Sequence, residues 1–296
     1  MKTKLSIVFL NYNRLVETRF TSEFLAKTVQ KRQDIEVIAV DNASVDGTWE
    51  YLQSQTWMQV LRRDKNLGIE GYNAAFELTK GEFILVLDDD SHPQDLATLN
   101  HLIEQLDQNP DWGVIACNIV GKQGNRLTSW HLPENNKAGQ SMFFIGCGFI
   151  IRRQLFKKIG WYPASFFLYQ NELDVAFQVR QLGYQIRYDP EAKVIHRNES
   201  VDSRPNWRRL YYATRNTIWL LRRYFPLPQS LYLIASRLII GLVGALRSGE
   251  WSWYFKAVKH AFSEPITPQI LSPDLRKEMD KFWKQNSLWH QITRQL

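Results

Sequence analysis

Three consecutive aspartates, Asp88, Asp89 and Asp90, follow the apolar run 83–87. Side chains two positions apart share one face of an extended strand, so Asp88 and Asp90 are predicted to point the same way. Two carboxylates on one rim suit Mg²⁺ or Mn²⁺ bridged to phosphate oxygens. The alternative is a solvated acidic turn or a helix N-cap. The buried run directly before the acids favours the metal.

A further acid, Asp41, follows the apolar run 37–40 in the same way. A carboxylate at a strand end can accept hydrogen bonds from a base N–H or from ribose hydroxyls. Tyr12, after the first apolar run, offers an aromatic face on which a base can stack. The alternatives are a turn-forming Asp41 and a half-buried, packing Tyr12.

Two more carboxylates, Glu172 and Asp174, stand near the start of the helical pattern 175–182. Helical positions turn by about 100°, so these two side chains point about 200° apart and at most one can face a common crevice. Beside a metal-bound phosphate, a carboxylate can deprotonate an incoming hydroxyl. The alternative role is to complement the helix dipole. His196 follows the last strand-like run and is either a metal ligand or a buried core histidine.

The elements that must position these residues alternate along the first two-thirds of the chain. Short apolar runs predict strands at 5–10, 36–40, 59–61, 83–87 and 113–117, and helical spacing predicts helices at 16–31, 48–55, 70–78 and 95–108. Two short closing strands are expected at 184–188 and 193–195. The pattern predicts an α/β fold with a mainly parallel sheet and helices on both faces. In such sheets ligands bind at the carboxyl ends of the strands.

The composition is that of a globular protein of 296 residues, 44% hydrophobic and 23% charged, with only two cysteines. Cys117 and Cys147 lie in apolar stretches, which argues against a disulfide framework and a structural zinc site. The first apolar run is too short for a signal-peptide core, so a cytosolic location is expected.

Charge divides the chain in two. Residues 1–196 hold 21 basic and 23 acidic residues, whereas residues 197–296 hold 16 and 7. Between positions 203 and 249 there are eight arginines and neither acid nor lysine. This asymmetry indicates a polyanionic or membrane-surface partner for the C-terminal part. Nucleic acid is not expected, because no nucleic-acid motif accompanies the charge.

The apolar run 231–246 is shorter than the about 20 residues needed to cross a bilayer, and Arg237 stands within it. It is expected to lie in the interface of an anionic membrane, with Trp219, Trp251 and Trp253 as amphipathic anchors. The alternatives are a helical subdomain packed on the sheet and a homodimer through the C-terminal helices.

The order of these motifs resembles the family 2 glycosyltransferases, which have the GT-A fold and use nucleotide-sugar donors. The resemblance covers roughly residues 4–200 and is carried by SIVFLNYNR at 6–14, VDNASVDGT at 40–48, Asn66, Gly68 and Asn73, LDDD at 87–90, GCGFIIRR at 146–153, and the segments 167–174, 183–184 and 190–196.

The resemblance assigns roles to individual residues. Asp88 and Asp90 become the first and last acids of the DxD motif, with Asp90 the main ligand of Mg²⁺ or Mn²⁺ and His196 a further one. The donor-binding set is Asn11, Tyr12, Asp41, Asn66, Asp88 and Asp89. Glu172 stands where the family places its catalytic base, and Asp174 is the second choice. The family motif has an acid where this chain has Asn171, which cannot act as a base.

These assignments imply a GT-A catalytic domain at 1–200 and a basic helical region at 201–296. We expect an inverting, metal-dependent transferase that moves a hexose from a UDP- or dTDP-linked donor to a hydroxyl acceptor, expected to be lipid-linked. By analogy the chain resembles rhamnosyltransferases of surface polysaccharide assembly, working on the inner face of the cell membrane. One alternative is a non-catalytic nucleotide-sugar-binding or membrane-docking module. The other, a nucleotidyltransferase, is disfavoured because no glycine-rich, lysine-containing loop lies near the N-terminus.

Overall fold

The structure is a computed structural model that describes residues 2–127, 132–133, 135–197 and 207–285, with side chains described up to residue 279. The chain divides into two compact units. Unit 1 comprises Met1–Phe167 and Asn171–Glu199, and unit 2 comprises Leu168–Gln170 and Ser200–Leu296.

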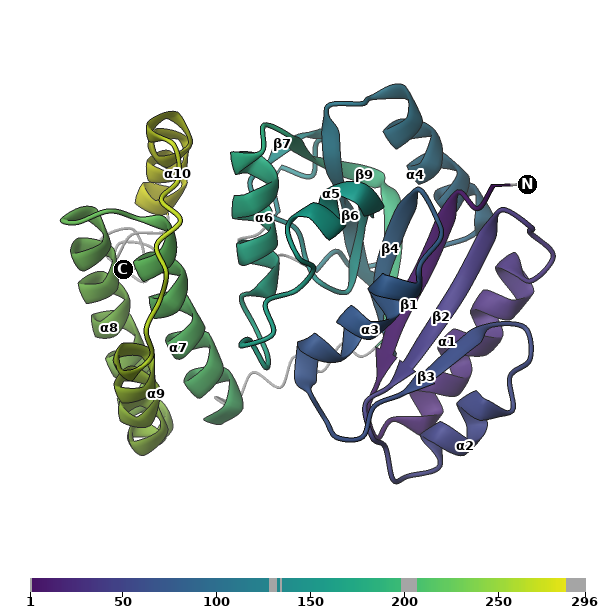
Figure 1. Cartoon of the computed structure of the whole chain (residues 1–296), viewed down its shortest axis with the longest axis horizontal. Coiled ribbons are helices and arrows are strands. Elements are labelled where there is room, and N and C mark those ends of the chain that lie inside the picture. The colour runs from purple at the N-terminus through teal and green to yellow at the C-terminus, as the bar shows by residue number, and fades with distance from the viewer. Residues whose placement is uncertain (1, 128–131, 134, 198–206, 286–296) are drawn as a thin grey trace. The chain divides into compact units, whose positions relative to one another are not determined.

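Unit 1 is built on one sheet, drawn in Figure 1. Within the described residues its strands are β1 (Leu5–Asn11), β2 (Ile35–Asp41), β3 (Gln59–Arg62), β4 (Phe83–Asp88), β5 (Ser91–Pro93), β6 (Trp112–Gly121), β7 (Gly139–Ser141), β8 (Gly148–Arg152) and β9 (Gln185–His196). Their order is β3-β2-β1-β4-β8-β6-β9-β5, and β7 pairs with β9.

The predicted parallel sheet is present in the half of the sheet that carries the acids. Strands β3, β2, β1 and β4 run parallel to one another. The other half is mixed, because β8 lies antiparallel between β4 and β6. The apolar run before residue 152 is therefore an antiparallel central strand, and its burial on both faces is what gives it a sequence like that of the parallel strands.

The helices of unit 1 are α1 (Leu15–Val29), α2 (Thr48–Gln53), the short η1 (Gly68–Glu70), α3 (Gly71–Leu78), α4 (Leu96–Gln108), α5 (Arg153–Lys158) and α6 (Asn171–Gln181). Local chemistry explains two of their ends. The Asp95 side chain caps α4 by accepting the backbone N–H of Thr98 at 2.8 Å. Gly183 follows α6 in the left-handed conformation, with φ 86°.

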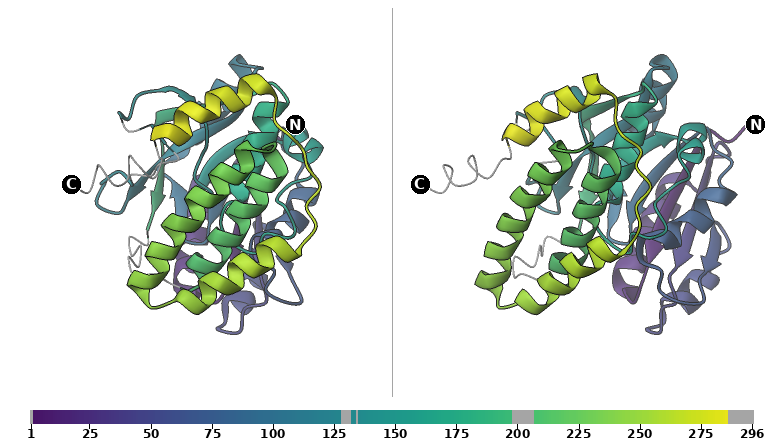
Figure 2. Two further views of the ribbon diagram at one scale, coloured as in Figure 1. Left: turned by 90° about the vertical axis from the view of Figure 1, so that its left-hand side faces the viewer. Right: turned by 60° about the vertical axis from the view of Figure 1, so that its left-hand side comes forward.

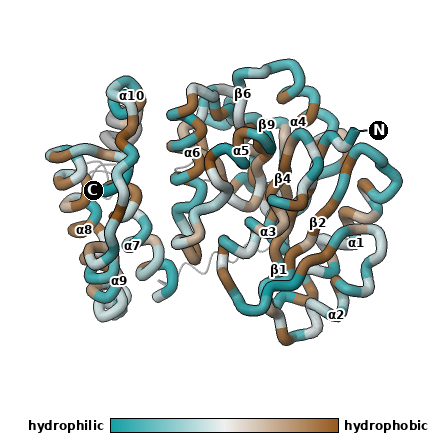
Figure 3. The backbone as a smooth tube through the Cα atoms, in the orientation of Figure 1, coloured by the Kyte–Doolittle hydropathy of each residue, from teal (hydrophilic) through white to brown (hydrophobic). Residues whose placement is uncertain are grey.

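The two faces of the sheet are covered by different helices. Leu5, Ile7 and Phe9 of β1 share a buried cluster with Leu25 of α1 and Leu102 of α4. Strand side chains alternate between faces, so the intervening residues of β1 face the other layer. The tube in Figure 3 is brown, and so hydrophobic, along β1, β2 and β4, as expected for strands covered on both sides.

The second layer contains α3. A Cβ on Gly71 of α3 would lie 2.7 Å from Cδ1 of Leu10 in β1, so this helix packs directly on the strand. Phe76 of α3 in turn contacts Phe156 of α5, with tilted rings whose centroids are 4.8 Å apart. The predicted helices on both faces are thus present.

One prediction about the closing strands was wrong. Segments 184–188 and 193–195 are not two strands but parts of the single strand β9. The register against β6 shifts between Cys117 and Asn118, whose partners are Asp189 and Lys193. Pro190 offers no N–H to the ladder, and its carbonyl instead accepts the Asn118 amide at 2.9 Å. The irregularity shifts the register of the strand without ending it.

The secondary structure described in unit 2 is helical. It contains α7 (Trp207–Tyr224), α8 (Gln229–Ser248), α9 (Trp251–Ser263) and α10 (Pro273–Gln285). The first three pack on one another, as Figure 2 shows. Asn216 of α7 is buried, and its amide donates to the carbonyl oxygens of Leu168 and Tyr169 at 2.8 and 2.9 Å.

Within the described residues one helix, α8, has the length and apolar composition that a membrane span requires. Core helices of soluble proteins meet the same criterion. The expectation that Trp219 is an interfacial anchor was wrong: its ring is 6% exposed and lies 4.2 Å from the guanidinium of Arg215. Trp253 stacks on Trp207, with centroids 4.3 Å apart, whereas Trp251 is 56% exposed.

Candidate active site

The carboxyl ends of β1, β2 and β4 bring the polar residues of unit 1 to one edge of the sheet. The parallel register pairs Asn11 with Asp41, and Leu10 with Asp88. Three segments that are far apart in the sequence therefore end side by side. This is the edge at which open α/β sheets bind their ligands.

The three aspartates leave the strand differently from the prediction. β4 ends at Asp88, and Asp89 and Asp90 form a turn before the short strand β5. Strand alternation is therefore not what brings Asp88 and Asp90 together. The turn does so: it is closed by Ser91, whose hydroxyl accepts the backbone N–H of Asp88 at 2.8 Å.

Asp90 is held between a guanidinium and an imidazole and is 2% exposed. Its Oδ2 lies 2.7 Å from Nη2 of Arg14, and its Oδ1 lies 3.3 Å from Nε2 of His196. Burial opposes ionisation of this carboxyl, but His196 and Arg14 outweigh it and lower the pKa of Asp90. The carboxylate is thus kept charged inside the site.

The pKa values of the two neighbouring acids, Asp88 and Asp89, are raised instead of lowered. Burial and the Asp90 charge raise the pKa of Asp88, whose Oδ1 lies 3.0 Å from the hydroxyl of Tyr72. Burial also raises the pKa of Asp89 well above its ordinary value, although Arg14 lies 3.2 Å from its Oδ1. The cluster therefore holds more acid groups than it has cations to balance them.

His196 reaches the cluster because β9 pairs with β5. Ser91 is opposite His196 in that antiparallel pair, and the backbone N–H of Arg197 donates to the carbonyl of Asp90 at 2.8 Å. Burial lowers the pKa of His196, but Asp90 and Asp88 raise it by more, and the net shift is upward. This histidine belongs to the acidic cluster rather than to the apolar core.

Glu172 lies in the first turn of α6 and its carboxylate is packed over Gly146. A Cβ on Gly146 would lie 2.5 Å from Oε1 of Glu172. Burial is the main cause that raises the pKa of Glu172 to about 7, and the charge of Asp88 adds to it. A carboxyl with that pKa can accept a proton near neutral pH.

Asp174, the second choice for the base, is placed differently. It is 1% exposed, and its Oδ2 accepts the side-chain amide of Gln178 at 2.7 Å, one turn further along α6. Asn171, where the family motif has an acid, is also buried, at 2% exposed. The structure brings Glu172 to the acidic cluster and ties Asp174 to its own helix.

The residues expected to hold the nucleoside lie at the ends of β1 and β2. Tyr12 is 38% exposed, whereas Asn11 and Asp41 are fully buried. The Asn11 amide donates to the carbonyl of Val40 at 3.0 Å, which ties β1 to β2. Asp41 accepts the backbone N–H of Ser44 at 3.2 Å and lies 3.6 Å from Nε of Arg62.

Asn66 is engaged in shaping a loop. Its Oδ1 accepts the amide of Asn42 at 2.9 Å and the backbone N–H of Gly68 at 2.8 Å. Asn42 is itself buried and accepts the backbone N–H of Leu67. These bonds fix the backbone of the loop that enters η1. Asn66 therefore shapes the loop at this edge of the sheet, and its Oδ1 is occupied by these bonds.

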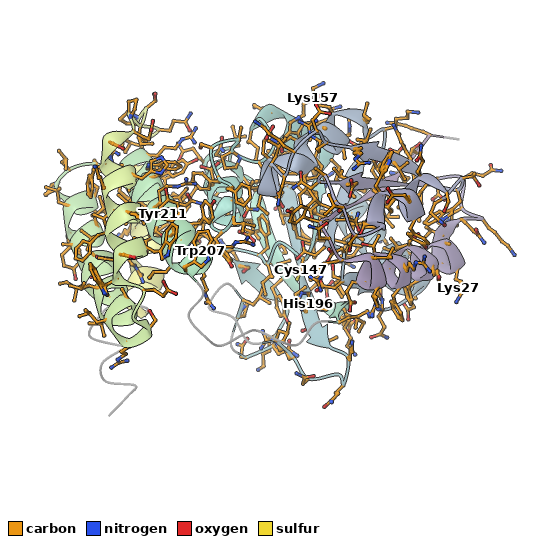
Figure 4. All side chains as sticks on the ribbon, turned by 90° about the horizontal axis from the view of Figure 1, so that it is seen from below. Lys27, Cys147, Lys157, His196, Trp207 and Tyr211 are labelled. Atoms are coloured by element: carbon orange, nitrogen blue, oxygen red, sulfur yellow. The ribbon has the colours of Figure 1, made fainter. Side chains whose placement is uncertain are left out.

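Sequence reasoning missed Arg14, Tyr72 and Cys147 as residues of this site. Arg14 follows β1 within the motif at 6–14, and its position directly after a strand end was a usable signal. Cys147 gave none, because a thiol in an apolar run has the pattern of a core residue. In the structure Cys147 lies close to Asp88 and His196, and Figure 4 labels it beside His196.

The cluster suits a divalent cation. Nδ1 of His196 is buried and has no hydrogen-bond partner among the described residues, and Oδ1 of Asp90 meets only the ion-pair contact of 3.3 Å with Nε2 of His196. Ligand atoms of Asp88, Cys147 and His196 all lie within 4.8 Å of one another. Buried polar atoms are normally paired, and excess carboxylates next to an imidazole are ligands that divalent metals take.

Comparisons with known proteins identify the family and the fold of the chain. The chain matches the Glycosyl transferase family 2 over residues 6–173, more than half of its length. An uncharacterized protein of Haemophilus influenzae (strain ATCC 51907 / DSM 11121 / KW20 / Rd) is 31% identical over 107 residues, which are 33% of this chain and 58% of that relative. The chain thus spans little more than half of that relative's length.

Two solved structures show the same fold. The mannosyltransferase PcManGT from Pyrobaculum calidifontis, in complex with GDP-Man and Mn²⁺, superposes with a TM-score of 0.61 at 16% identity, over 90% of this chain and 89% of that one. S. aureus TarS 1-349 in complex with UDP-GlcNAc gives a TM-score of 0.64 at 18% identity, over 86% and 79%. The predicted GT-A fold, with its C-terminal helical region, is confirmed by these likenesses.

Proposed function

The chain belongs to glycosyl transferase family 2, and on that premise we propose that it transfers a hexosyl group from a nucleoside-diphosphate sugar to a hydroxyl acceptor with inversion at the anomeric carbon. The family and the fold establish a nucleotide-sugar glycosyltransferase. The stereochemistry, the metal requirement and the substrates are what we add.

The observation that carries the proposal is the position of Glu172. Its carboxylate lies over Gly146, in a chain segment that also carries Cys147 into the acidic cluster, and the charge of Asp88 reaches it. With a pKa of about 7, Glu172 can take the proton of an acceptor hydroxyl as that oxygen attacks the sugar. One base and one displacement give inversion, and no covalent sugar–enzyme intermediate is required.

The leaving diphosphate would be placed at the opposite side of the reacting carbon, against the aspartate cluster. Asp88, Asp90 and His196 are the residues that would hold Mg²⁺ or Mn²⁺, for the unpaired imidazole nitrogen and excess acid described above. A bound divalent cation supplies positive charge that stabilises the departing diphosphate. Arg14, already paired with Asp89 and Asp90, adds a fixed cation to the same rim.

The nucleoside would lie across the ends of β1 and β2. Tyr12 is exposed enough to stack on a base. We propose that Asp41 accepts hydrogen bonds from a base or ribose, for which its fully buried carboxylate must become accessible when the donor binds. PcManGT was solved with GDP-Man and TarS with UDP-GlcNAc, so both kinds of base are found on this fold. We propose a UDP- or dTDP-linked donor for this chain.

We propose further that the acceptor is lipid-linked, that it serves surface polysaccharide or glycolipid assembly, and that unit 2 holds the enzyme on the cytoplasmic face of an anionic membrane. Exposed apolar residues of α8 recur at helical spacing on one side: Tyr232, Ile239, Val243 and Leu246. On α9 the same is true of Trp251, Phe255 and Phe262. Such faces, with many arginines and no acid over 203–249, suit anionic lipid.

The decisive experiment is a transfer assay with UDP-, dTDP- and GDP-sugars and polyprenyl-linked acceptors, with Mg²⁺, Mn²⁺ or EDTA. We expect one donor to turn over, EDTA to abolish transfer, and the product to have the anomeric configuration opposite to that of the donor. Retention of configuration contradicts the mechanism. Tight donor binding with no turnover of any donor would instead indicate a non-catalytic nucleotide-sugar-binding module, the alternative suggested by Asn171 at a position where the family motif has an acid.

A further inference from the structure

The metal-binding cluster contains a thiol. Cys147 lies just before β8, 7% exposed, and its backbone carbonyl accepts the hydroxyl of Ser91 at 2.8 Å. Ser91 directly follows the aspartates, so this bond fixes Cys147 against the turn that carries them. Its sulfur lies within 4.8 Å of ligand atoms of Asp88 and His196.

A carboxylate, a thiol and an imidazole form a different kind of ligand set from the oxygen-rich one that Mg²⁺ prefers. Mg²⁺ keeps oxygen ligands and octahedral geometry, whereas Zn²⁺ and its softer relatives take sulfur and nitrogen in a tetrahedron. Three donors around a tetrahedral Zn²⁺ lie about 3.3–3.8 Å apart, given bonds of about 2.0–2.3 Å. The three atoms now lie within 4.8 Å of one another, so side-chain movements of about 1 Å would bring them to that spacing.

We propose that Asp88, Cys147 and His196 form a thiolate-containing site for Zn²⁺ or Cd²⁺, which competes with Mg²⁺ or Mn²⁺ for Asp88 and His196 and so blocks transfer. The ion replaces the thiol proton, which leaves to the buffer, and a sulfur–metal bond forms. The binding step is independent of the proposed function, whereas the competition rests on it.

The neighbours of the thiol explain why a metal is needed to ionise it. Burial raises the pKa of Cys147 well above its ordinary value, and the charges of Asp88, Asp90 and Glu172 add to that effect. A protonated thiol is a weak ligand for the hard cations that oxygen sites hold, whereas a softer ion displaces the thiol proton and binds the sulfur. A soft divalent ion supplies the positive charge that balances the thiolate among these acids.

The second cysteine provides a matched control. Cys117 on β6 is 1% exposed, and burial likewise raises the pKa of its thiol. The only candidate metal group found among the described residues contains Cys147 and not Cys117. Since the chain has two cysteines in all, removing one leaves a protein with a single thiol.

The test is a titration of EDTA-stripped, reduced full-length protein with Cd²⁺, followed through the ultraviolet thiolate-to-cadmium charge-transfer band. We expect one Cd²⁺ per chain with that band in the native protein and in Cys117→Ala, and no band in Cys147→Ala or Cys147→Ser. His196→Ala should keep the band and bind Cd²⁺ about 10–100-fold more weakly. Excess Mn²⁺ should weaken Cd²⁺ binding.

Absence of the band in folded native protein overturns the proposal, and so does its loss in Cys117→Ala. If the Cys147 variants do not fold, as judged by circular dichroism, Cys117→Ala decides alone, because Cys147 is then its only thiol. Inhibition of transfer by Zn²⁺, weakened at least about tenfold by Cys147→Ser, tests the competition. A Cd²⁺ band in a protein that transfers no sugar would sink the proposed function and leave the site intact.

Discussion

Glu172 and Gly146 are in direct contact: a Cβ on Gly146 would lie 2.5 Å from Oε1 of Glu172. The absence of a side chain at position 146 is therefore what lets the carboxylate of α6 lie against the segment before β8. The next residue in that segment, Cys147, belongs to the acidic cluster. The contact thus connects the proposed base to the residues expected to hold the diphosphate.

Gly146→Ala should lower kcat about 100-fold and leave donor KM unchanged, because a displacement of about 1 Å at a reacting group costs about that much. The clash involves the flexible end of a side chain, so the melting temperature should hardly change. Gly139→Ala is the control, since a Cβ there would meet nothing within 4 Å. Unchanged kcat in Gly146→Ala would contradict the placement of the base. Steady-state kinetics and thermal melts provide both readouts.

Glu172→Gln should reduce kcat by about 10²–10⁴-fold, because it removes a general base while keeping the shape of the side chain. Donor affinity, measured by calorimetry, should stay the same. Asp174→Asn is the comparison: its partner is Gln178, so we expect a lower melting temperature and kcat within about tenfold of native. The reverse pattern would assign the base to Asp174.

The pH profile should report the titration of Glu172. Because the base must be ionised, kcat/KM should rise about tenfold per pH unit below the pKa, which burial raises to about 7, and level off above it. Whereas activity should rise with pH, the contribution of Glu172 to the stability of the fold should fall with pH. A folded-state pKa above the ordinary value of 4.5 means that the native protein binds the extra proton between 4.5 and about 7.

Native protein should therefore lose stability relative to Glu172→Gln as the pH rises through that window. Chemical unfolding of the two proteins at matched pH values measures this difference. A difference that stays flat, or that grows in favour of the native protein with rising pH, would refute the assignment of the raised pKa to Glu172.

Arg14→Met should raise the affinity for Mn²⁺ in the absence of donor by about tenfold, or about 1.4 kcal/mol. The reason is that Arg14 lies 2.7 Å from Asp90 and 3.2 Å from Asp89 and so neutralises charge that the cation would otherwise meet. Without Mn²⁺ the variant should melt at a lower temperature, because Asp89 and Asp90 lose the guanidinium beside them and Asp90 keeps only His196. Calorimetry with Mn²⁺ checks the first effect and thermal melts the second.

Arg19→Met is the matched control, because it removes the same charge at a position within α1, the helix that Arg14 directly precedes. Its guanidinium lies 5.0 Å from the ring centroid of Tyr51, and we expect its loss to leave Mn²⁺ binding unchanged. Weaker Mn²⁺ binding in Arg14→Met would show that Arg14 supports the cation instead of competing with it.

The double variant Ile239→Asp/Leu246→Asp should reduce binding to vesicles containing anionic phospholipid at least about tenfold, because two charges are then placed on the exposed apolar face of α8. Cosedimentation measures the effect, and high salt should weaken the native interaction. Val16→Asp, on a 74% exposed valine of unit 1, is the control. The contrary result is a native protein that fails to bind vesicles, while light scattering finds a native dimer and a monomeric double variant. That result would show that the exposed apolar face of α8 is a self-association surface.

The sequence by itself determined the alternation of strands and helices, the parallel strands that end at Asn11, Asp41 and Asp88, and the acids that gather there. These features follow from local rules, since hydrophobic periodicity and strand-end chemistry act within a few residues of each other. His196 was also predicted at a strand end, although as one of two readings.

The tertiary structure alone decided how the site is composed. Arg14 meets Asp90 across 76 residues of sequence, and Cys147 joins Asp88 because β8 runs antiparallel beside β4. Neither contact leaves a local pattern, because each depends on strand order and on which way a loop turns. Local helix geometry shows only that Glu172 and Asp174 point in different directions. The tertiary structure adds that the Glu172 carboxylate, and not that of Asp174, lies against Gly146, and this contact is the basis on which we propose Glu172 as the base.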